Sequence, residues 1–422
     1  MRMIINIHWM MNYLNKLTVA ALLLTAFSAP LQAQAEGYSY ETLVASKPAA
    51  VKAYGKPDTV MPELINAWGI AIRPVGAGGH FWVTSRDKSF QYTGDVRASD
   101  DAKFQILKAD PIIPTITIPN GGAGNFTTGV TFTRSKDFEV EQTTPQNVTV
   151  KAPAKFLFAA DGGIISAWTE HKKDDGTFDW PNYAKAMIDE SKLGTQFFGL
   201  TLNNTGDQLY AANFGKNARV ETFNSNFKPA NIAFDQPFDK NQNSKVDSGE
   251  YAPYNVRDIK GHVFVTYAMT QACNKEGLEK KDCKKGEIYA GEEVKAKGKG
   301  RIAEFSEDGK LIAIWNDKGM LNAPWGMEVA PDSFGALAGK MLVGSFGDGT
   351  ITVFDPETKG ATGKLMVGGK PFKLEGLWGL QFGNGATLGD ANALYLAAGP
   401  EDEKQGAFGV IRPIQTTESK PE

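Results

Sequence analysis

The densest group of potential metal ligands in this sequence is a polar segment of twelve residues, 239–250, which reads Asp-Lys-Asn-Gln-Asn-Ser-Lys-Val-Asp-Ser-Gly-Glu. Oxygen-bearing side chains stand at its first, third, fifth, ninth and twelfth positions, and the seventh offers a backbone carbonyl. Ca²⁺ binds six to eight oxygens, and alternate residues of a curling loop point toward its centre. The spacing therefore predicts a calcium site with these ligands: Asp239, Asn241, Asn243, Lys245, Asp247 and Glu250.

This segment resembles the calcium loop of EF-hand proteins, which ends in a bidentate Glu. Glu250 matches that twelfth position, and Val246 matches the apolar eighth. Ser244 departs from the pattern, because the sixth residue is normally a Gly with positive φ, which Ser adopts less readily. The alternative is a polar surface loop that binds no metal. If an ion binds, we expect it to order an insertion rather than to catalyse.

Cysteine and histidine are too sparse to indicate a redox centre or a transition-metal site. Cys273 and Cys283 are the two cysteines of the chain, and both lie in a Lys-rich polar stretch. In an oxidising compartment we expect them to pair as a local disulfide bond. Beyond residue 35 the histidines are His80, His171 and His262, each assigned to a different repeat. A histidine general base is therefore not expected.

A repeated pattern indicates the framework that positions these groups. A small or turn residue precedes a strand with alternating apolar positions in six segments, spaced roughly 55 to 70 residues apart: 66–72, 128–132, 198–202, 254–259, 322–329 and 377–382. A second strand follows each of them, and a turn and a third strand follow in most copies. Short strands with Gly and Asp turns at a regular period are typical of antiparallel sheets arranged radially. The pattern predicts an all-β chain folded as a six-bladed β-propeller.

The two ends of the repeat region predict how the ring closes. The last repeat ends near Ile411 and is one strand short, whereas 38–45 is a lone strand before the first repeat. We expect this N-terminal strand to complete the sixth blade, so that the propeller spans 36–413. Within it, 271–299 is an insertion in the region of blade four, and 414–422 is a polar tail expected to be disordered.

The first residues have the pattern of a secretory signal peptide. Arg2 and Lys16 precede an uncharged apolar run, 17–31, and Ala33-Gln34-Ala35 suits signal peptidase. We expect cleavage near Ala35 and a periplasmic or secreted protein. Losing Arg2 and Lys16 changes the net charge from −3 to −5, which argues against nucleic acid as a partner. No other segment is apolar enough to span a bilayer.

The propeller mouth is the second candidate site. The start of each inner strand and the end of the next strand lie at the same end of the axis, where propellers commonly bind ligands. That geometry selects polar residues from several repeats: Asn66, Arg86, Asp161, Asn213, Asn255, Asn322 and Ser345. The alternative is that the Asn amides only satisfy backbone groups in tight turns. Trp68, Trp325 and Trp378 precede inner strands at equivalent places, where they either wall a pocket or wedge neighbouring blades together.

Several motifs are similar to those of a family of secreted bacterial proteins of uncharacterised function, over about 43–411. They include Asn-Ala-Trp-Gly at 66–69, and the others stand at 211–214, 224–229, 251–256, 322–326 and 376–385. Members of that family look like six-bladed propellers related to NHL-repeat proteins and, more distantly, to the gluconolactonase and senescence-marker family. The resemblance implies a fold and a secreted location, and it carries over no reaction.

Two functions remain open at this point. The first is a ligand- or protein-binding scaffold whose partner is a small molecule, a carbohydrate or a protein. The second is a calcium-dependent hydrolase of the lactonase kind, in which a central ion polarises a carbonyl group and activates water. Side chains of suitable type for that ion are Glu63, Asp161, Asn213, Asn255 and Glu375. The sequence offers no convincing catalytic set, and so it favours binding.

Overall fold

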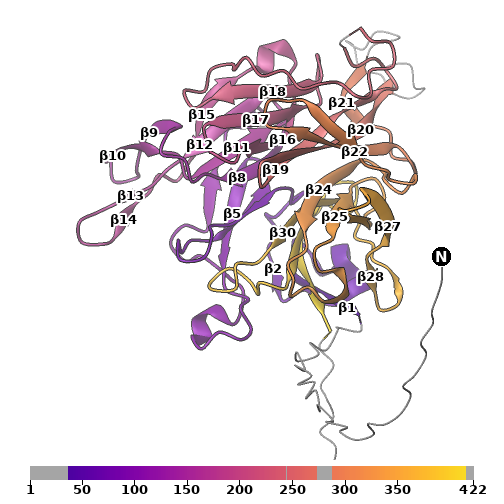
Figure 1. Ribbon diagram of the computed structural model, residues 1–422. Coiled ribbons are helices and arrows are strands. Elements are labelled where there is room, and N and C mark those ends of the chain that lie inside the picture. Colours follow the sequence, from indigo (N-terminus) through magenta and orange to yellow (C-terminus); the bar gives the residue numbers. More distant parts are fainter. Residues whose placement is uncertain (1–36, 244, 273–287, 415–422) are drawn as a thin grey trace, which may run out of the picture. The chain divides into compact units, whose positions relative to one another are not determined.

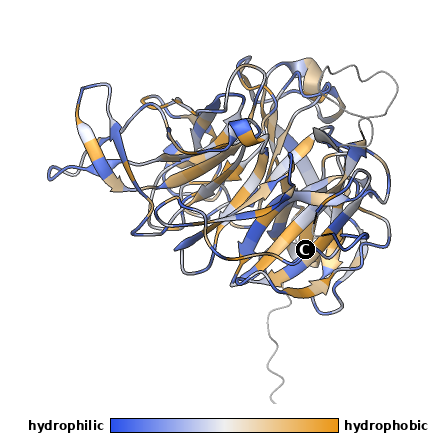
Figure 2. Cartoon of the chain, turned by 90° about the horizontal axis from the view of Figure 1, so that it is seen from above, coloured by the Kyte–Doolittle hydropathy of each residue, from blue (hydrophilic) through white to orange (hydrophobic). Residues whose placement is uncertain are grey.

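The computed structural model describes residues 37–243, 245–272 and 288–414. Six of their sheets have three to five strands and follow one another along the chain, so the predicted six-bladed β-propeller is confirmed. The expected signal peptide, Cys273, Cys283 and the tail beyond Ile414 lie outside these ranges. Apolar residues are concentrated along the strands and polar residues along the loops, as Figure 2 shows. This distribution follows from the short alternating strands, which bury side chains against the neighbouring blades.

The first three blades contain the following strands. Blade one has β3 (Ile70–Ala71), β4 (Phe81–Ser85) and β5 (Lys88–Thr93), with β6 (Lys108–Ala109) and β7 (Thr115–Thr117) outside. Blade two has β8 (Thr127–Phe132), β11 (Phe156–Ala160), β12 (Ile164–Trp168) and β15 (Lys185–Asp189). Blade three has β16 (Phe197–Leu202), β17 (Gln208–Asn213) and β18 (Arg219–Asn224).

Blade three has three strands, whereas a propeller blade usually has four. An isolated bridge between Phe223 and Pro229 stands in the place of its outer strand. Pro229 has no N–H group to donate to a ladder, which limits pairing at that edge.

The last three blades are more regular. Blade four has β19 (Tyr251–Ile259), β20 (His262–Ala272), β22 (Gly300–Ser306) and β23 (Leu311–Ile314), and β21 (Ile288–Glu293) pairs with the end of β20. Blade five has β24 (Pro324–Val329), β25 (Met341–Ser345), β26 (Ile351–Asp355) and β27 (Gly360–Lys364). Blade six has β30 (Leu377–Phe382), β31 (Leu394–Ala398) and β32 (Ala407–Pro413).

The N-terminal strand completes blade six, as predicted. β1 (Tyr38–Ala45) pairs antiparallel with β32, from Tyr38 opposite Pro413 to Ala45 opposite Ala407. β2 (Thr59–Val60) adds a short parallel strand on the far side of β1. Figure 1 shows β1 beside the yellow C-terminal strands although the two are at opposite ends of the chain. One sheet therefore joins the first and last strands of the ring.

The inner strands surround the central axis. β3 contacts β8, and the contacts continue through β16, β19, β24 and β30 back to β3. Five of these strands carry a Gly at the same repeat position, namely Gly69, Gly129, Gly199, Gly326 and Gly379. A Cβ atom at Gly326 would lie 2.5 Å from the carbonyl oxygen of Trp378, and one at Gly379 would lie 2.5 Å from that of Trp68. Only glycine permits such close approach of neighbouring strands.

Short elements in the connections complete the structure. Two hairpins leave blade two, β9 (Glu139–Thr143) with β10 (Thr149–Pro153) and β13 (His171–Lys172) with β14 (Phe178–Asp179), and Figure 1 shows both at its left edge. β28 (Met366–Val367) pairs with β29 (Lys370–Pro371). The 3₁₀ turns are η1 (Pro48–Tyr54), η2 (Ala102–Phe104), η3 (Ser191–Leu193) and η4 (Gly335–Leu337). No helix in the described ranges is long and apolar enough to cross a membrane.

Candidate functional site

A cluster of aromatic side chains, the aromatic plug, fills the axis at the end where the inner strands begin. All six blades contribute to it: Trp68, Phe126, Phe198, Phe214, Tyr254, Trp325, Phe346 and Trp378. Trp378 lies between two rings, with centroids 3.7 Å from Trp68 and 3.8 Å from Phe346, and both pairs are stacked. Its indole N–H donates to Asn66 Oδ1 at 2.9 Å. The three predicted tryptophans therefore pack against one another and against rings of the neighbouring blades, in keeping with the packing alternative.

A cavity of about 510 Å³ occupies the axis beyond the plug. Its walls come from all six inner strands, and the residues that follow those strands, such as Pro74, Arg134 and Lys260, form its rim. Trp325 belongs both to the plug and to the lining, so the plug is the floor of the cavity. The cavity thus opens at the opposite end from the mouth that the sequence analysis selected. Its volume lies in the usual range for small-molecule sites.

The cavity wall carries a polar ring at one repeat position, two residues after the glycine position of each inner strand. Its members are Ala71, Thr131, Thr201, Arg257, Glu328 and Gln381. Five of the six line the cavity, and the sixth, Glu328, is bound to Arg257. Residues two apart on a strand share a face, so the regular glycine fixes the orientation of this ring.

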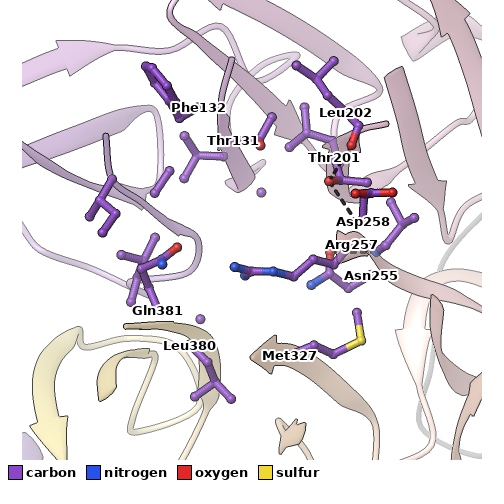
Figure 3. Close-up of a pocket in the computed structure, with 18 of the residues that line it drawn as sticks. Thr131, Phe132, Thr201, Leu202, Asn255, Arg257, Asp258, Met327, Leu380 and Gln381 are labelled. Carbon is purple, nitrogen blue, oxygen red and sulfur yellow. Dashed lines mark hydrogen bonds between the residues drawn. The ribbon is translucent and has the colours of Figure 1, made fainter. Parts of the chain in front are cut away.

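The Arg257 side chain reaches from its strand into the cavity, as Figure 3 shows. Its Nη2 donates to Glu328 Oε1 at 2.5 Å, across the junction of blades four and five. The Arg257 side chain is 31% exposed, whereas that of Glu328 is 11% exposed. Burial raises the pKa of Glu328, and the Arg257 guanidinium opposes that rise. The pair therefore keeps a buried carboxylate next to a guanidinium that faces the cavity.

Blade four departs from the glycine pattern at the cavity wall. Asn255 stands where the other five inner strands have Gly. Its Nδ2 donates to the Trp325 carbonyl oxygen at 2.8 Å, and its Oδ1 accepts from the Val256 N–H at 2.8 Å. A Cβ atom at Gly199 would lie 1.8 Å from Asn255 Oδ1, so Gly199 leaves the room that the amide needs. Of the predicted mouth amides, Asn255 is the one in the cavity lining.

The other predicted mouth residues lie at the plug end. Asn213 is fully buried, and its Oδ1 accepts from the Gly215 and Gln196 N–H groups. Asn322 is 5% exposed and its N–H donates to Ser345 Oγ at 3.3 Å. Arg86 is exposed in the turn between β4 and β5. Asn213 thus fits the structural alternative, in which an amide satisfies backbone groups in a turn, whereas the Asn322 amide oxygen is buried without a hydrogen-bond partner in the described structure.

A group of carboxyl side chains lies beside the plug. Asn66 Nδ2 donates to Glu403 Oε2 at 2.8 Å, and the Tyr254 hydroxyl donates to Glu293 Oε2 at 3.0 Å. Burial raises the pKa of Glu293 to about 7 and that of Asp161 to about 7. Burial also raises the pKa of Glu403. Such shifts mark a candidate functional site, although structural carboxyls show them too.

The raised pKa of Glu293 predicts a measurable effect on stability. The unfolded chain loses this proton near the ordinary value of 4.5 and the folded chain near 7, so folding is progressively disfavoured as the pH rises between them. Glu293→Gln should therefore raise the melting temperature at pH 7.5 and leave it unchanged at pH 4 relative to wild type. We expect a gain of about 1–3 kcal/mol at neutral pH. Thermal unfolding of both proteins from pH 4 to 8.5 checks this, and parallel curves would contradict it.

The segment 239–250 brings most of its predicted ligands together. Asn241 Nδ2 and Asn243 Nδ2 contact Asp247 Oδ2 at 2.7 and 2.9 Å. Glu250 accepts from the N–H groups of Lys240 and Asp247 at 3.1 and 3.0 Å.

The remaining ligand positions of this segment lie close by. Asn243 N–H contacts Asp239 Oδ1 at 3.4 Å, and Lys245 N–H contacts Asn243 Oδ1 at 2.9 Å. Ser244 is outside the described ranges. Within those ranges, no three His, Cys, Asp or Glu side chains are grouped so as to hold a metal ion. Calcium binding here would therefore depend on the Asn amides as well as the carboxylates.

The polar ring is the feature that sequence reasoning missed. The repeats predict the inner strands correctly, but most of the recurring Asn and Trp residues that precede these strands lie at the plug end and not in the cavity wall. The usable signal lay two residues after the glycine, where five of six strands carry Thr, Arg, Glu or Gln in an otherwise apolar strand. Glu293 and Glu403 were missed as well, because both stand outside the repeat-equivalent positions and reach the plug only through folding.

Comparisons with known proteins assign no activity to this chain. No family model matches the chain. Two uncharacterised proteins of Acanthamoeba polyphaga mimivirus are 25% identical over 351 residues and 26% identical over 357 residues. The matches cover 83% of this chain and 75% and 80% of those proteins. These relatives are viral, so the bacterial origin that the resemblance implied is not supported.

Solved structures with a similar arrangement show low identity. The soluble aldose sugar dehydrogenase of Escherichia coli has a TM-score of 0.43 at 12% identity, over 89% of this chain and 99% of that one. A protein of unknown function from Bacteroides thetaiotaomicron has a TM-score of 0.45 at 8% identity, over 89% of this chain and 76% of that one.

Proposed function

We propose that this protein is an exported binding protein that holds a small polar molecule in its central cavity. The observation that carries the proposal is the cavity of about 510 Å³, which is floored by the aromatic plug and walled by all six inner strands. Sites built on strands are held more rigidly than sites on loops. The polar ring supplies directed hydrogen-bonding groups, and Ile70, Val130 and Leu380 supply apolar wall. The proposed export rests on the signal-peptide pattern of residues 1–35.

Filling the cavity should abolish binding. Thr131 lines the cavity and has no side-chain hydrogen bond within the described structure, so Thr131→Trp adds bulk without removing a contact. Thr149→Trp on exposed β10 is the matched control. We expect ligand-observed NMR with a set of sugars, polyols, amino acids and organic acids to give signals with wild type and Thr149→Trp that vanish with Thr131→Trp. Signals that survive in Thr131→Trp would place the ligand elsewhere.

We also propose that the segment 239–250 binds Ca²⁺. An Asn amide turned by 180° presents oxygen in place of nitrogen, so Asn241 and Asn243 can supply ligands beside Asp247 and Glu250 without backbone movement. Glu250 directly precedes β19, and its carbonyl oxygen accepts from the Thr270 N–H at 2.8 Å. An ion in this loop would therefore stabilise the start of the strand that carries Arg257.

Calcium should stabilise the protein through Glu250. If the affinity resembles that of extracellular calcium modules, 10 mM Ca²⁺ should raise the melting temperature by about 2–3 °C. Glu250→Gln should remove this gain, while Glu63→Gln, at an exposed position, should keep it. Elemental analysis should find one calcium per chain in wild type and in Glu63→Gln only. Equal calcium in all three proteins would locate the ion elsewhere, and none in wild type would contradict the proposal.

Hydrolysis is the second candidate function, and the carboxyl groups beside the plug are the observation in its favour. Asp161 and Glu293 both titrate near pH 7, where a carboxyl group serves as acid or base. The other side chains considered for a central ion are engaged elsewhere. Glu63 and Glu375 are exposed, Asn213 Oδ1 accepts from backbone N–H groups, and both ends of the Asn255 amide bind backbone groups. Turnover of lactones or esters that is lost in Asp161→Asn would establish this function. Binding that is unchanged in Asp161→Asn favours the first one.

A further inference from the structure

The charges around the central cavity oppose the net charge of the chain. Arg134, Arg257 and Lys260 are among its lining residues, and Asp258 is the acidic residue in the same set. One Asp258 oxygen accepts from the Gly261 N–H at 3.2 Å, as part of the turn after β19. The chain as a whole carries a net charge of −3. A cavity whose lining residues are more often cationic than anionic attracts negative ligands even in an acidic protein.

Hydrogen-bond donors outnumber acceptors at the level of the polar ring. A guanidinium has five N–H donors and no acceptor. The structure gives Arg257 one partner within the described residues, Glu328, so several donors remain for a ligand. Both ends of the Asn255 amide are used by the protein, and Gln381 Nε2 donates to the Phe382 carbonyl oxygen at 3.1 Å. A ligand that fits this set is rich in acceptors.

The orientation of the Arg257 guanidinium makes the cavity selective for particular anionic groups. Figure 3 shows the guanidinium in the middle of the cavity, directed toward the side of Gln381 and Thr131. Glu328 holds it from the neighbouring strand, so the fork is oriented before a ligand arrives. An oriented guanidinium binds a carboxylate or phosphate through two parallel hydrogen bonds, which a Lys ammonium does not reproduce.

We propose that the ligand of the central cavity is a small organic anion, with a carboxylate or a phosphate group bound by the Arg257 guanidinium. This inference rests on the proposed function of the cavity and adds the chemical class of the ligand. Phosphate and carboxylate share the acceptor geometry that the fork recognises. The remaining polar parts of the ligand contact Thr131 and Gln381 of the polar ring. The test below distinguishes an anionic ligand from a neutral one, such as a sugar.

The test uses matched pairs of small molecules with ligand-observed NMR and titration. Each pair is an organic acid and its primary amide, or a sugar phosphate and the free sugar. Wild type should bind members of the charged set at least ten-fold more tightly than their neutral partners. The carboxylate and phosphate sets together identify which of the two groups is preferred. Added NaCl should weaken binding of the charged members only.

Variants of the ion pair separate recognition from structure. Arg257→Gln alone would leave Glu328 buried and unpaired, so Arg257→Gln is combined with Glu328→Gln. The double variant should lose about ten- to a hundred-fold in affinity for the anion while remaining folded. Arg257→Lys, which keeps the positive charge but not the fork, should lose part of the affinity for the anion. Glu328→Gln alone should tighten anion binding several-fold, because the guanidinium no longer shares its charge with a carboxylate. A merely structural pair would not show that gain.

The outcomes also separate this inference from the proposed function. If neutral members bind as well as charged ones, and Thr131→Trp abolishes both, the cavity is the binding site and the anion inference is wrong. If Thr131→Trp leaves binding unchanged, or no member binds wild type, the proposed function itself fails. If the double variant of Arg257→Gln and Glu328→Gln is folded and binds the anion as tightly as wild type, Arg257 does not act as the anchor.

Discussion

Removal of β1 (Tyr38–Ala45) should prevent the ring from closing and leave no cooperatively folded propeller. Tyr38, Leu43 and Val44 are 6%, 3% and 1% exposed, and burying them stabilises the fold by about 1.5–3 kcal/mol each. The Tyr38 hydroxyl also donates to the Phe334 carbonyl oxygen at 2.6 Å, on blade five. The sum approaches the whole stability of a typical domain, about 5–15 kcal/mol. The deletion also leaves β32 as an exposed edge strand, with unpaired backbone N–H and C=O groups.

Restoring the strand separately provides the control for this deletion. A peptide of residues 37–46 added to the truncated protein should pair with β32 and recover a cooperative thermal transition, and a scrambled peptide should not. Tyr38→Phe, which loses only the hydroxyl contacts to Phe334 and Leu337, should cost about 1 kcal/mol. A truncated protein that melts at the wild-type temperature would show that closure contributes little.

The fold could be predicted because its determinants are local and repeated. Short apolar runs such as β11 and β25, a glycine at one position of five of the six inner strands, and turns at similar spacing all indicate the same repeated sheet. The pairing of β1 with β32 was predictable, because the last repeat lacked one strand and β1 was the one strand that belonged to no repeat. The missed outer strands, β15 and β27, are less apolar, with exposed residues such as Lys185 and Ala186 in β15.

The location of the site could not be predicted from the same repeats. Which end of the axis is filled depends on the summed volume of side chains from six separate segments, not on any one of them. The stack of Trp68, Trp378 and Phe346 closes one end, and small residues such as Ala71 and Thr131 leave the other end open. Pairing of Arg257 with Glu328 also required two strands from different blades to be placed side by side.

Trp378→Ala should give the second large effect, because it removes the middle ring of the aromatic plug. Trp378 is 1% exposed, stacks on two rings and donates to Asn66 Oδ1. Replacing such a residue by Ala costs about 3–5 kcal/mol, which for a chain of this length lowers the melting temperature by about 4–6 °C. Differential scanning calorimetry measures this shift, and Trp378→Phe, which keeps an aromatic ring, should recover part of it.

The same variant tests whether the plug serves the cavity as its floor. Trp168→Ala is the matched control, because Trp168 is also 1% exposed and bonded through its indole N–H, yet it packs between blades one and two away from the axis. Both variants should lose stability, but only Trp378→Ala should weaken ligand binding, since it opens the floor of the cavity to water from the other end. Equal loss of binding in the two variants would show that affinity follows overall stability, and unchanged binding in both would show that the plug is needed for folding alone. The aromatic plug thus contributes both to the stability of the propeller and to ligand binding, because the rings that close one end of the axis also form the floor of the cavity at the other end.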